Sequence, residues 1–348
     1  MTDLRAMALT LAIAGVGGWL FVLLDLPLPW LLGAMLATTA ASLAGLRLTV
    51  ARPVRGSMLV VLGLLIGSAF TPELLAELPR WLWSLAALPL YVVLIGGVVM
   101  VYLTRVAGFE PRTAYFAATP GGLGEMVLLA DHYGADVRRV ALVHSLRVVL
   151  LVTAIPFVVA KLGLTLPTPP PAGPPPTWLE TLTLLAVGGV GVAVVQVLRV
   201  PSGLLLGAMT ASAIAHIVGW VESYPPAALV ALAQVVIGAS VGSRFSGLGA
   251  RAVFHALGHG AVITVLMLVL AAALAVLVHP LAGIALLPLL IAYVPGGVAE
   301  MALIALALGI DPAFVAVHHV VRIALVVGLA PVMLRMATGG RGDVRDGN

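Results

Sequence analysis

Two short segments of this chain carry residues that could do chemistry, and they are copies of each other. Residues 119–126 read Thr-Pro-Gly-Gly-Leu-Gly-Glu-Met and residues 294–301 read Val-Pro-Gly-Gly-Val-Ala-Glu-Met, an offset of 175. A histidine and an arginine follow each copy at that same offset. The candidate substrate- or ion-binding residues are Pro120, Gly121, Gly122, Glu125, His144, Arg147, Pro295, Gly296, Gly297, Glu300, His319 and Arg322. A carboxylate, an imidazole and a guanidinium can bind an anion and carry a proton.

The duplication extends over most of the chain. Further matches at the offset of 175 are Gly134 with Gly309, Asp136 with Asp311 and Pro156 with Pro331. Upstream, the Gly-Ala-Met of residues 33–35 returns at an offset of 174 in residues 207–209, and Ile66-Gly67 matches Ile237-Gly238 at 171. Such an internal duplication suggests a two-fold pseudosymmetric site rather than two separate domains.

Composition defines the environment of that site. Hydrophobic residues make up 61% of the 348 and charged residues 9%, with a mean hydropathy of +1.16. A soluble globular protein would carry about 25% charge, so the sequence predicts a multispanning, all-α membrane protein. The chain has no cysteine, which excludes disulfides, thiolate catalysis and cysteine-ligated metals. The net charge of +4 reflects arginines in loops and does not indicate nucleic-acid binding.

The chain has ten apolar stretches, and most of them approach the roughly 20 residues that cross a bilayer as helix, although those at 57–71 and 227–243 are short. They lie near residues 6–24, 28–45, 57–71, 82–106, 139–162, 178–198, 203–221, 227–243, 256–279 and 313–335. We divide the chain into a first membrane repeat (1–162), a Pro-rich linker (163–177), a second membrane repeat (178–336) and a flexible cytoplasmic tail (337–348).

Positive charge orients these spans. If each repeat has about five spans and its Pro-Gly-Gly segment is broken or re-entrant, the two repeats are inverted. Fourteen basic residues then face the cytoplasm with both termini, and only Arg80 and Lys161 face outward, as the positive-inside rule requires. The cytoplasmic group is Arg5, Arg47, Arg52, Arg55, Arg105, Arg112, Arg138, Arg139, Arg199, Arg244, Arg251, Arg335, Arg341 and Arg345. If the motif segments crossed fully, the repeats would instead have six spans and be parallel.

The motif is expected to break its helix. Proline lacks a backbone donor and glycine tolerates almost any backbone angle, so Pro-Gly-Gly should end one helical piece and start the next. Glu125 and Glu300 then lie in a first helical turn, where the helix dipole favours a carboxylate. In the inverted arrangement the two breaks could meet near the bilayer midplane, where transporters bind substrates. The structural alternative is a kink that lets helices pack closely.

Each histidine is three residues before its arginine, so the two share a helix face. An arginine inside a span is costly unless it faces a partner or water. Arg147 and Arg322 could bind an anionic substrate group, or form ion pairs with Glu125 and Glu300 that only hold the bundle together. His144 and His319 could join a proton relay or act as neutral hydrogen-bonding residues. Asp136 and Asp311 are expected to be helix N-caps.

The duplicated Pro-Gly-Gly-x-x-Glu-Met, the His-x-x-Arg after each copy and the paired Gly-Ala-Met resemble the AbrB family of bacterial membrane proteins, which is built from two copies of one repeat. The resemblance covers nearly the whole chain. It implies the labels that members carry, ammonia monooxygenase or regulator of gene expression. The residues supply neither a soluble DNA-binding domain nor a histidine-rich ligand set for copper.

We therefore predict a multi-pass protein of the bacterial inner membrane. It would be a secondary transporter for a small, anionic organic solute, with proton coupling a further hypothesis and no enzymatic activity. The alternatives are a membrane-embedded sensor that regulates gene expression indirectly and, third, a metal-dependent membrane monooxygenase. We expect no cofactor, no bound metal and no direct contact with nucleic acid. The expected partners are the solute and the lipid bilayer, and a homodimer is compatible with the sequence.

Overall fold

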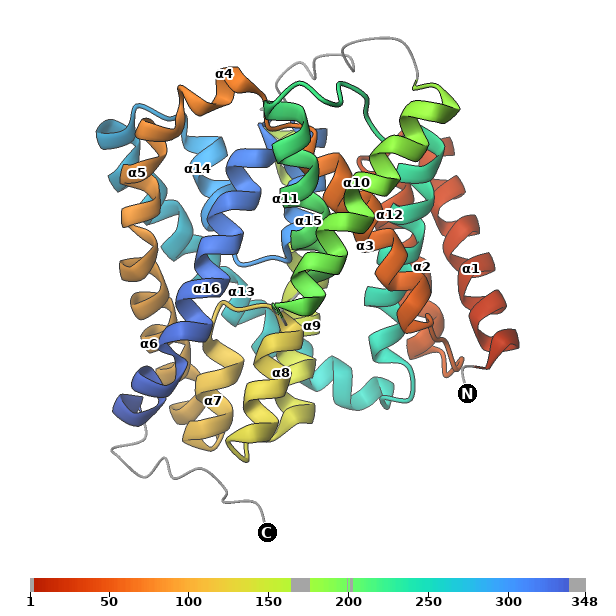
Figure 1. Ribbon diagram of the computed structural model, residues 1–348. Helices are drawn as coiled ribbons and strands as arrows, with labels where there is room; N and C mark the ends of the chain where they lie inside the picture. The colour runs from red at the N-terminus through yellow and green to blue at the C-terminus, as the bar shows by residue number, and fades with distance from the viewer. Residues whose placement is uncertain (1–2, 164–175, 199, 201–202, 338–348) are drawn as a thin grey trace. The chain divides into compact units, whose positions relative to one another are not determined.

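The computed structural model describes residues 3–163, 176–198, 200 and 203–337, and these residues form helices and their connections (Figure 1). No β-strand occurs in this part of the chain, so the predicted all-α fold is confirmed. Most of the predicted Pro-rich linker (164–175) and nearly all of the predicted tail (338–348) lie outside the described residues.

The apolar stretches predicted from the sequence form helices. Each of the ten stretches lies on one or two helices, which are α1 (Leu4–Leu23), α2 (Pro29–Leu43), α3 (Arg52–Gly67), α5 (Leu78–Ala86) with α6 (Leu88–Arg105), α9 (Val137–Lys161), α10 (Trp178–Val197), α11 (Gly203–Ile217), α12 (Ala227–Gly242), α13 (Ala250–Ala282) and α16 (Pro312–Ala337). Seven helical segments in the described residues are long and apolar enough to cross a membrane. The protein is therefore a helical membrane protein.

The chain divides into two compact units, and each unit takes segments from both repeats. Unit 1 comprises Met1–Glu77, Val152–Val253 and Ala302–Ala313, and unit 2 comprises Leu78–Leu151, Phe254–Met301 and Phe314–Asn348. The early helices of the two repeats thus lie together in unit 1. The later helices, which include both Pro-Gly-Gly segments, lie together in unit 2.

Small residues bring the helices of unit 1 into close contact. Gly17 of α1 faces Gly33 of α2, and a Cβ on either glycine would collide with the carbonyl of the other. Gly191 of α10 and Gly207 of α11 repeat this arrangement in the second half of the chain. The Gly-Ala-Met segments therefore allow close helix packing, as predicted.

A second pair of crossings corrects one alignment made from the sequence. In α3, a Cβ on Gly67 would collide with the Met209 carbonyl of α11; in α12, a Cβ on Gly242 would collide with the Met35 carbonyl of α2. The structural counterpart of Gly67 is therefore Gly242, at an offset of 175, and its match to Gly238 was wrong. The error is four residues, about one helical turn, because these helices carry two glycines four positions apart on one face.

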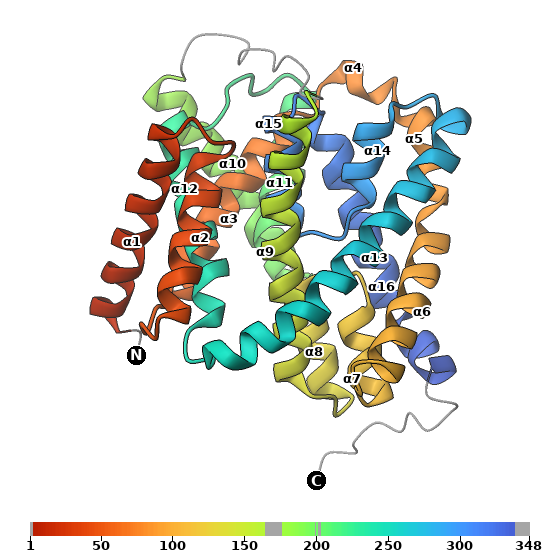
Figure 2. The same ribbon diagram turned by 180° about the vertical axis from the view of Figure 1, so that it is seen from behind.

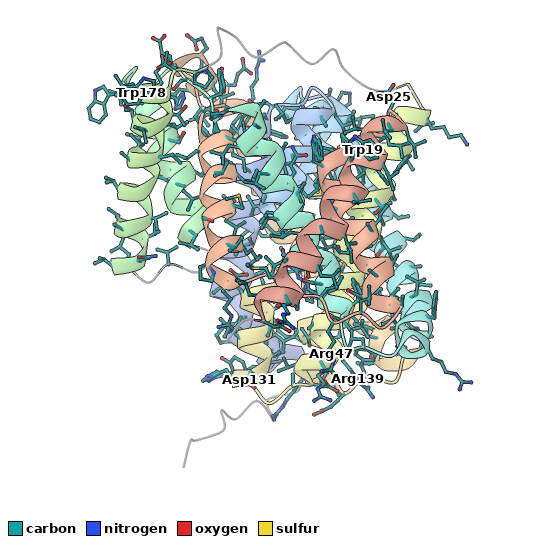
Figure 3. The ribbon with its side chains drawn as sticks, turned by 90° about the vertical axis from the view of Figure 1, so that its right-hand side faces the viewer. Trp19, Asp25, Arg47, Asp131, Arg139 and Trp178 are labelled. Carbon is teal, nitrogen blue, oxygen red and sulfur yellow. The ribbon has the colours of Figure 1, made fainter. Side chains whose placement is uncertain are left out.

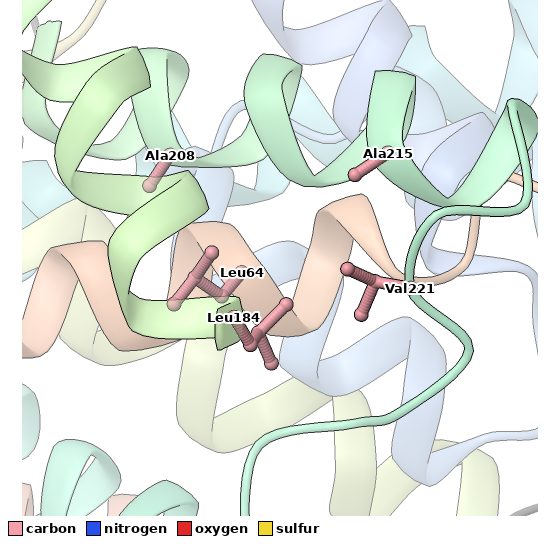
Figure 4. Packing of buried hydrophobic residues seen from close by; sticks show 5 residues of the cluster. All are labelled: Leu64, Leu184, Ala208, Ala215 and Val221. Carbon is pink, nitrogen blue, oxygen red and sulfur yellow. The ribbon is translucent and has the colours of Figure 1, made fainter. Parts of the chain in front are cut away.

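Apolar side chains fill the space around these crossings. Leu64 of α3 packs with Leu184 of α10, Ala208 and Ala215 of α11, and Val221 in the segment after α11 (Figure 4). All five are buried. A bilayer supplies no hydrophobic force between helices, so this packing holds unit 1 together by close contact.

Charged and aromatic residues mark the two ends of unit 1. Asp25 and Trp178 lie at one end, and Arg47 lies at the other (Figure 3). We predicted Arg47 to face the cytoplasm, and its place at the end opposite Asp25 and Trp178 is consistent with that orientation.

Unit 2 contains two helices that are interrupted. The first interruption separates α7 (Pro111–Ala118) from α8 (Leu123–His132), and the second separates α14 (Leu286–Tyr293) from α15 (Val298–Ala307). Within unit 2, α7 and α14 lie at opposite ends, as both views of the ribbon show (Figures 1 and 2). One short helix, α4 (Pro72–Leu75), and a 3-10 turn (Ser243–Phe245) complete the elements of unit 1.

Candidate functional site

Each Pro-Gly-Gly segment forms the break between two helices. Helix α7 ends at Ala118 and α8 begins at Leu123; in the second copy α14 ends at Tyr293 and α15 begins at Val298. The breaks therefore cover residues 119–122 and 294–297, which are equivalent at the offset of 175. The predicted break in each motif is confirmed.

The motif glycines provide space rather than unusual backbone angles. Neither Gly121 nor Gly122 has a positive φ. Instead, a Cβ on Gly121 would meet the side chain of Met126 at 2.8 Å, and a Cβ on Gly122 would collide with the carboxylate of Glu125. Our expectation that conformational freedom requires these glycines was wrong, because close approach of two motif side chains requires them.

The second copy has the same internal contacts. A Cβ on Gly296 would collide with Met301, and a Cβ on Gly297 would collide with the carboxylate of Glu300. Glycine, glutamate and methionine therefore form one packed unit at the start of α8 and again at the start of α15. This packing explains why the spacing of the motif is the same in both copies.

The two glutamates lie where the sequence placed them, in the first turn of α8 and of α15. Glu125 and Glu300 are both buried, at 8% exposure each. Each carboxylate covers the glycine that precedes its own helix, at the positive end of the helix dipole. An anion approaching either helix N-terminus would have to displace that carboxylate.

The two arginines bind the carbonyls that the breaks leave without helical partners. Arg147 donates from Nη2 to the Gly121 carbonyl at 3.2 Å and from Nη1 to the Thr119 carbonyl at 3.5 Å. Arg322 donates from Nη1 to the carbonyls of Tyr293 (3.2 Å) and Val294 (3.1 Å), and from Nη2 to that of Gly296 (3.1 Å). The last four carbonyls of a helix lack intrahelical donors, and its C-terminal end favours a cation.

This arrangement corrects the ion pair expected in the second repeat. Among the described residues Glu300 and Arg322 form no ion pair, because the guanidinium turns to the end of α14. The hydrogen bonds of Arg147 go to carbonyls and to a histidine. From the sequence we considered a carboxylate, water or an anionic substrate as the partner of each arginine, and missed the carbonyls that a broken helix exposes.

The two histidines differ between the copies. His144 Nε2 lies 2.9 Å from the Phe116 carbonyl and its Nδ1 lies 3.1 Å from Arg147 Nη2. A carbonyl can only accept and a guanidinium can only donate, so both bonds require a neutral His144 that carries its proton on Nε2. The Nδ1 of His319 instead lies 2.9 Å from the Val315 carbonyl of its own helix. His144 thus orients Arg147, whereas His319 has no such bond to Arg322.

Tyr91 on α6 is a residue of this site that the sequence did not single out. Its ring lies 5.9 Å from the ring of Tyr293, centroid to centroid. Tyr91 has no counterpart in the second repeat, so the duplication gave no signal. A tyrosine within a long apolar stretch was the one available clue.

His318 also belongs to the second break. Its Nε2 lies 2.8 Å from the hydroxyl of Ser84 on α5, and Ser84 accepts a hydrogen bond from the Tyr293 hydroxyl through its carbonyl at 2.9 Å. These bonds tie α5 to α14 and α16. The first repeat has Val143 at the equivalent position, so this network is confined to the second copy.

The other repeated residues have structural roles. Asp136 accepts from the amides of Arg138 and Arg139 at 3.0 and 3.1 Å, and Asp311 accepts from the amide of Ala313 at 2.8 Å, so both are N-caps as predicted. Gly134 and Gly309 have a φ of 69°. They end α8 and α15 in the left-handed conformation that glycine adopts without strain.

The described residues contain no group of three or more histidines, cysteines, aspartates or glutamates placed to hold a metal ion. The site instead contains two buried cations, Arg147 and Arg322. Each retains an Nε–H with no hydrogen-bond partner among the described residues, as does the Tyr91 hydroxyl. The site therefore offers buried donors and positive charge.

Comparison with known proteins places the chain in a family. Residues 30–338 match the family described as "Transition state regulatory protein AbrB". A Bacillus subtilis (strain 168) protein named "Uncharacterized protein YhjN" is 27% identical over 370 residues, covering 97% of this chain and 94% of its own. The Escherichia coli (strain K12) protein named "Putative regulator AbrB" is 30% identical over 229 residues, covering 65% of this chain and 66% of its own. No solved structure matches the chain. With the family match spanning most of its length, the chain belongs to the AbrB family.

Proposed function

We propose that this protein is a secondary transporter for a small organic anion in the bacterial inner membrane. The observation that carries the proposal is the pair of fully buried arginines, one at each of two helix breaks within one compact unit. Each arginine uses its terminal nitrogens on carbonyls and keeps an Nε–H with no partner in the described part of the chain. Ionisable residues inside membrane helices are rare. They face the interior of the helix bundle rather than lipid, and they commonly mark substrate or ion pathways.

Two features support an inverted pair of repeats and alternating access. Helices α7 and α14 lie at opposite ends of unit 2 (Figure 1), and equivalent helices of both repeats are gathered in each unit. Transporters built from inverted repeats bind their substrates at such discontinuous helices near the midplane. In our proposal the solute binds between residues 121–122 and 296–297, with Arg147 or Arg322 meeting its negative group.

The glutamates supply the coupling in this proposal. The carboxylates of Glu125 and Glu300 cover the N-termini of α8 and α15, so each competes with an incoming anion for the same positive region. Protonation of a glutamate removes that competition, and binding of the solute therefore strengthens as the pH falls. The proton and the anion would then move together, with no enzymatic step, cofactor, metal or direct contact with nucleic acid.

Uptake into proteoliposomes tests the proposal. The purified protein would be reconstituted, and uptake of radiolabelled propionate, pyruvate, benzoate and succinate measured with and without an inward proton gradient. We expect saturable uptake of at least one anion, stimulated by the gradient and lost in Arg147→Ala and Arg322→Ala. Gly124→Ala is the matched control, because a Cβ at this exposed position meets nothing within 4 Å. No uptake of any anion by the folded wild type would reject transport.

The second candidate function is a membrane-embedded sensor. The observation that favours it is the regulatory description of the family and the name of the E. coli relative. A sensor needs one pocket and a partner surface, whereas a transporter needs access to its site from both sides of the membrane. Deletion that changes the expression of other genes, together with absent uptake by the purified protein, would favour the sensor. The metal-enzyme alternative gains no support from the described residues.

A further inference from the structure

The Tyr91 hydroxyl differs from three other tyrosine hydroxyls of unit 2 in having no hydrogen-bond partner among the described residues. Tyr293 donates to the Ser84 carbonyl at 2.9 Å, Tyr115 donates to the Ala330 carbonyl at 3.3 Å, and Tyr102 lies 2.9 Å from His259 Nδ1. Tyr91 is 1% exposed, and its hydroxyl has no hydrogen-bond partner among the described residues. Burying a hydroxyl without a partner is unfavourable, so its retention calls for an explanation.

Geometry assigns this hydroxyl to the second break. The ring of Tyr91 packs against that of Tyr293, and the carbonyl of Tyr293 accepts from Arg322 Nη1 at 3.2 Å. Arg322 is also fully buried, and its Nε–H lacks a partner in the described part of the chain. The Tyr91 ring and the Arg322 guanidinium therefore both lie beside Tyr293, the last residue of α14, and each side chain has a polar donor with no partner among the described residues.

We propose that Tyr91 is a substrate-binding residue whose hydroxyl, with the Nε–H of Arg322, binds the carboxylate of a monocarboxylate solute. This inference rests on the proposed transport function and names its substrate class. We place recognition at the second break because Tyr91 packs beside it, whereas Arg147 at the first break is bonded to His144.

The chemistry of the two donors favours a carboxylate. A carboxylate has two oxygens, and two donors can satisfy one each; a phosphate dianion would need more donors and more neutralising charge. Counted formally, the two arginines and two glutamates of the site sum to zero. A monoanion that arrives with one proton leaves that sum unchanged, which makes a singly charged acid the solute class that the buried site tolerates best.

The test compares two tyrosines in the full-length protein. Binding of propionate, benzoate and pyruvate would be measured by titration calorimetry at pH 6 for the wild type, Tyr91→Phe and Tyr115→Phe, with propionamide and inorganic phosphate as comparison probes. Thermal unfolding of each unliganded variant would be recorded in parallel. Losing one hydrogen bond to a charged group should weaken binding about 10- to 100-fold in Tyr91→Phe. Its unfolding temperature should not fall, because no protein hydrogen bond is lost.

The control and the contrary outcomes follow from the same contacts. Tyr115→Phe should unfold at a lower temperature, since it loses the hydrogen bond to the Ala330 carbonyl, while its carboxylate affinity stays within about 3-fold of the wild type. Wild-type binding that Tyr91→Phe leaves unchanged would overturn this inference but not transport. Binding of propionamide or phosphate as tightly as propionate would overturn the carboxylate assignment. A wild type that binds no probe would overturn the proposed function itself.

Discussion

The two copies of the motif share one architecture but differ in the side chains that surround each arginine. In both, glycines make room for a methionine and a glutamate, and an arginine binds the carbonyls of the break. In the first copy His144 bridges the Phe116 carbonyl and Arg147. In the second, His319 bonds to its own helix and Tyr91 lies beside the break. The duplication thus preserves the scaffold. The copies differ in that a histidine bonds to the arginine in the first, whereas a tyrosine whose hydroxyl has no hydrogen-bond partner among the described residues lies beside the second.

Removing either arginine should produce the largest effect. Arg147→Ala and Arg322→Ala each leave two or more carbonyls without donors inside the protein, and we expect a loss of roughly 3–5 kcal/mol in the free energy of unfolding. Chemical unfolding in detergent measures it. A loss below about 1 kcal/mol in both variants would show that the arginines do not hold the breaks.

Adding one methyl group to a motif glycine should cause the next largest loss in the free energy of unfolding. Gly122→Ala and Gly297→Ala place a Cβ against a glutamate carboxylate, and we expect a loss of about 1–3 kcal/mol. The double variants with Glu125→Ala or Glu300→Ala should recover most of that loss, because the colliding group is gone. Gly124→Ala, two residues after Gly122, should be neutral or slightly stabilising. Equal effects in all three glycines would contradict the steric explanation.

The histidines test the difference between the copies directly. His144→Ala loses bonds to the Phe116 carbonyl and to Arg147, whereas His319→Ala loses one bond within its helix. We expect His144→Ala to be more destabilising by about 1 kcal/mol. Thermal unfolding of the two variants side by side gives this difference. The reverse order would mean that His319 stabilises its copy more than His144 does, which would contradict the difference in their hydrogen bonds.

Replacing the glutamates should change stability least and pH dependence most. Glutamine keeps the shape of a protonated glutamate, so Glu125→Gln and Glu300→Gln should alter the free energy of unfolding by under about 1 kcal/mol. In proteoliposomes, uptake should lose its response to a proton gradient, since no proton can be gained or released at that position. A gradient response that survives in both single variants and in the double variant would exclude these glutamates as the coupling groups.

Sequence patterns predicted the helices and their breaks better than they predicted the side-chain contacts of the site. The ten apolar stretches became helices, and the Pro-Gly-Gly segments became breaks, because span length and helix-breaking residues act locally. The interleaving of the repeats into two units was not predictable, since periodicity does not show which halves pack together. An ion pair between Arg322 and Glu300 was predicted because every residue has a backbone carbonyl, so a sequence does not show which carbonyls are free to bind an arginine. Tyr91 was missed because it is outside the duplication.

The most direct test of the account is whether the site opens to both sides of the membrane. The chain has no native cysteine, so Leu123→Cys and Val298→Cys, the first residues of α8 and α15, would each provide a single reactive thiol. Each variant would be labelled with a membrane-impermeant maleimide from the outside and, in inverted vesicles, from the inside. We predict that each thiol reacts from both sides and that a bound solute slows the reaction. Labelling from one side only, with or without solute, would contradict transport and leave a one-sided sensor pocket.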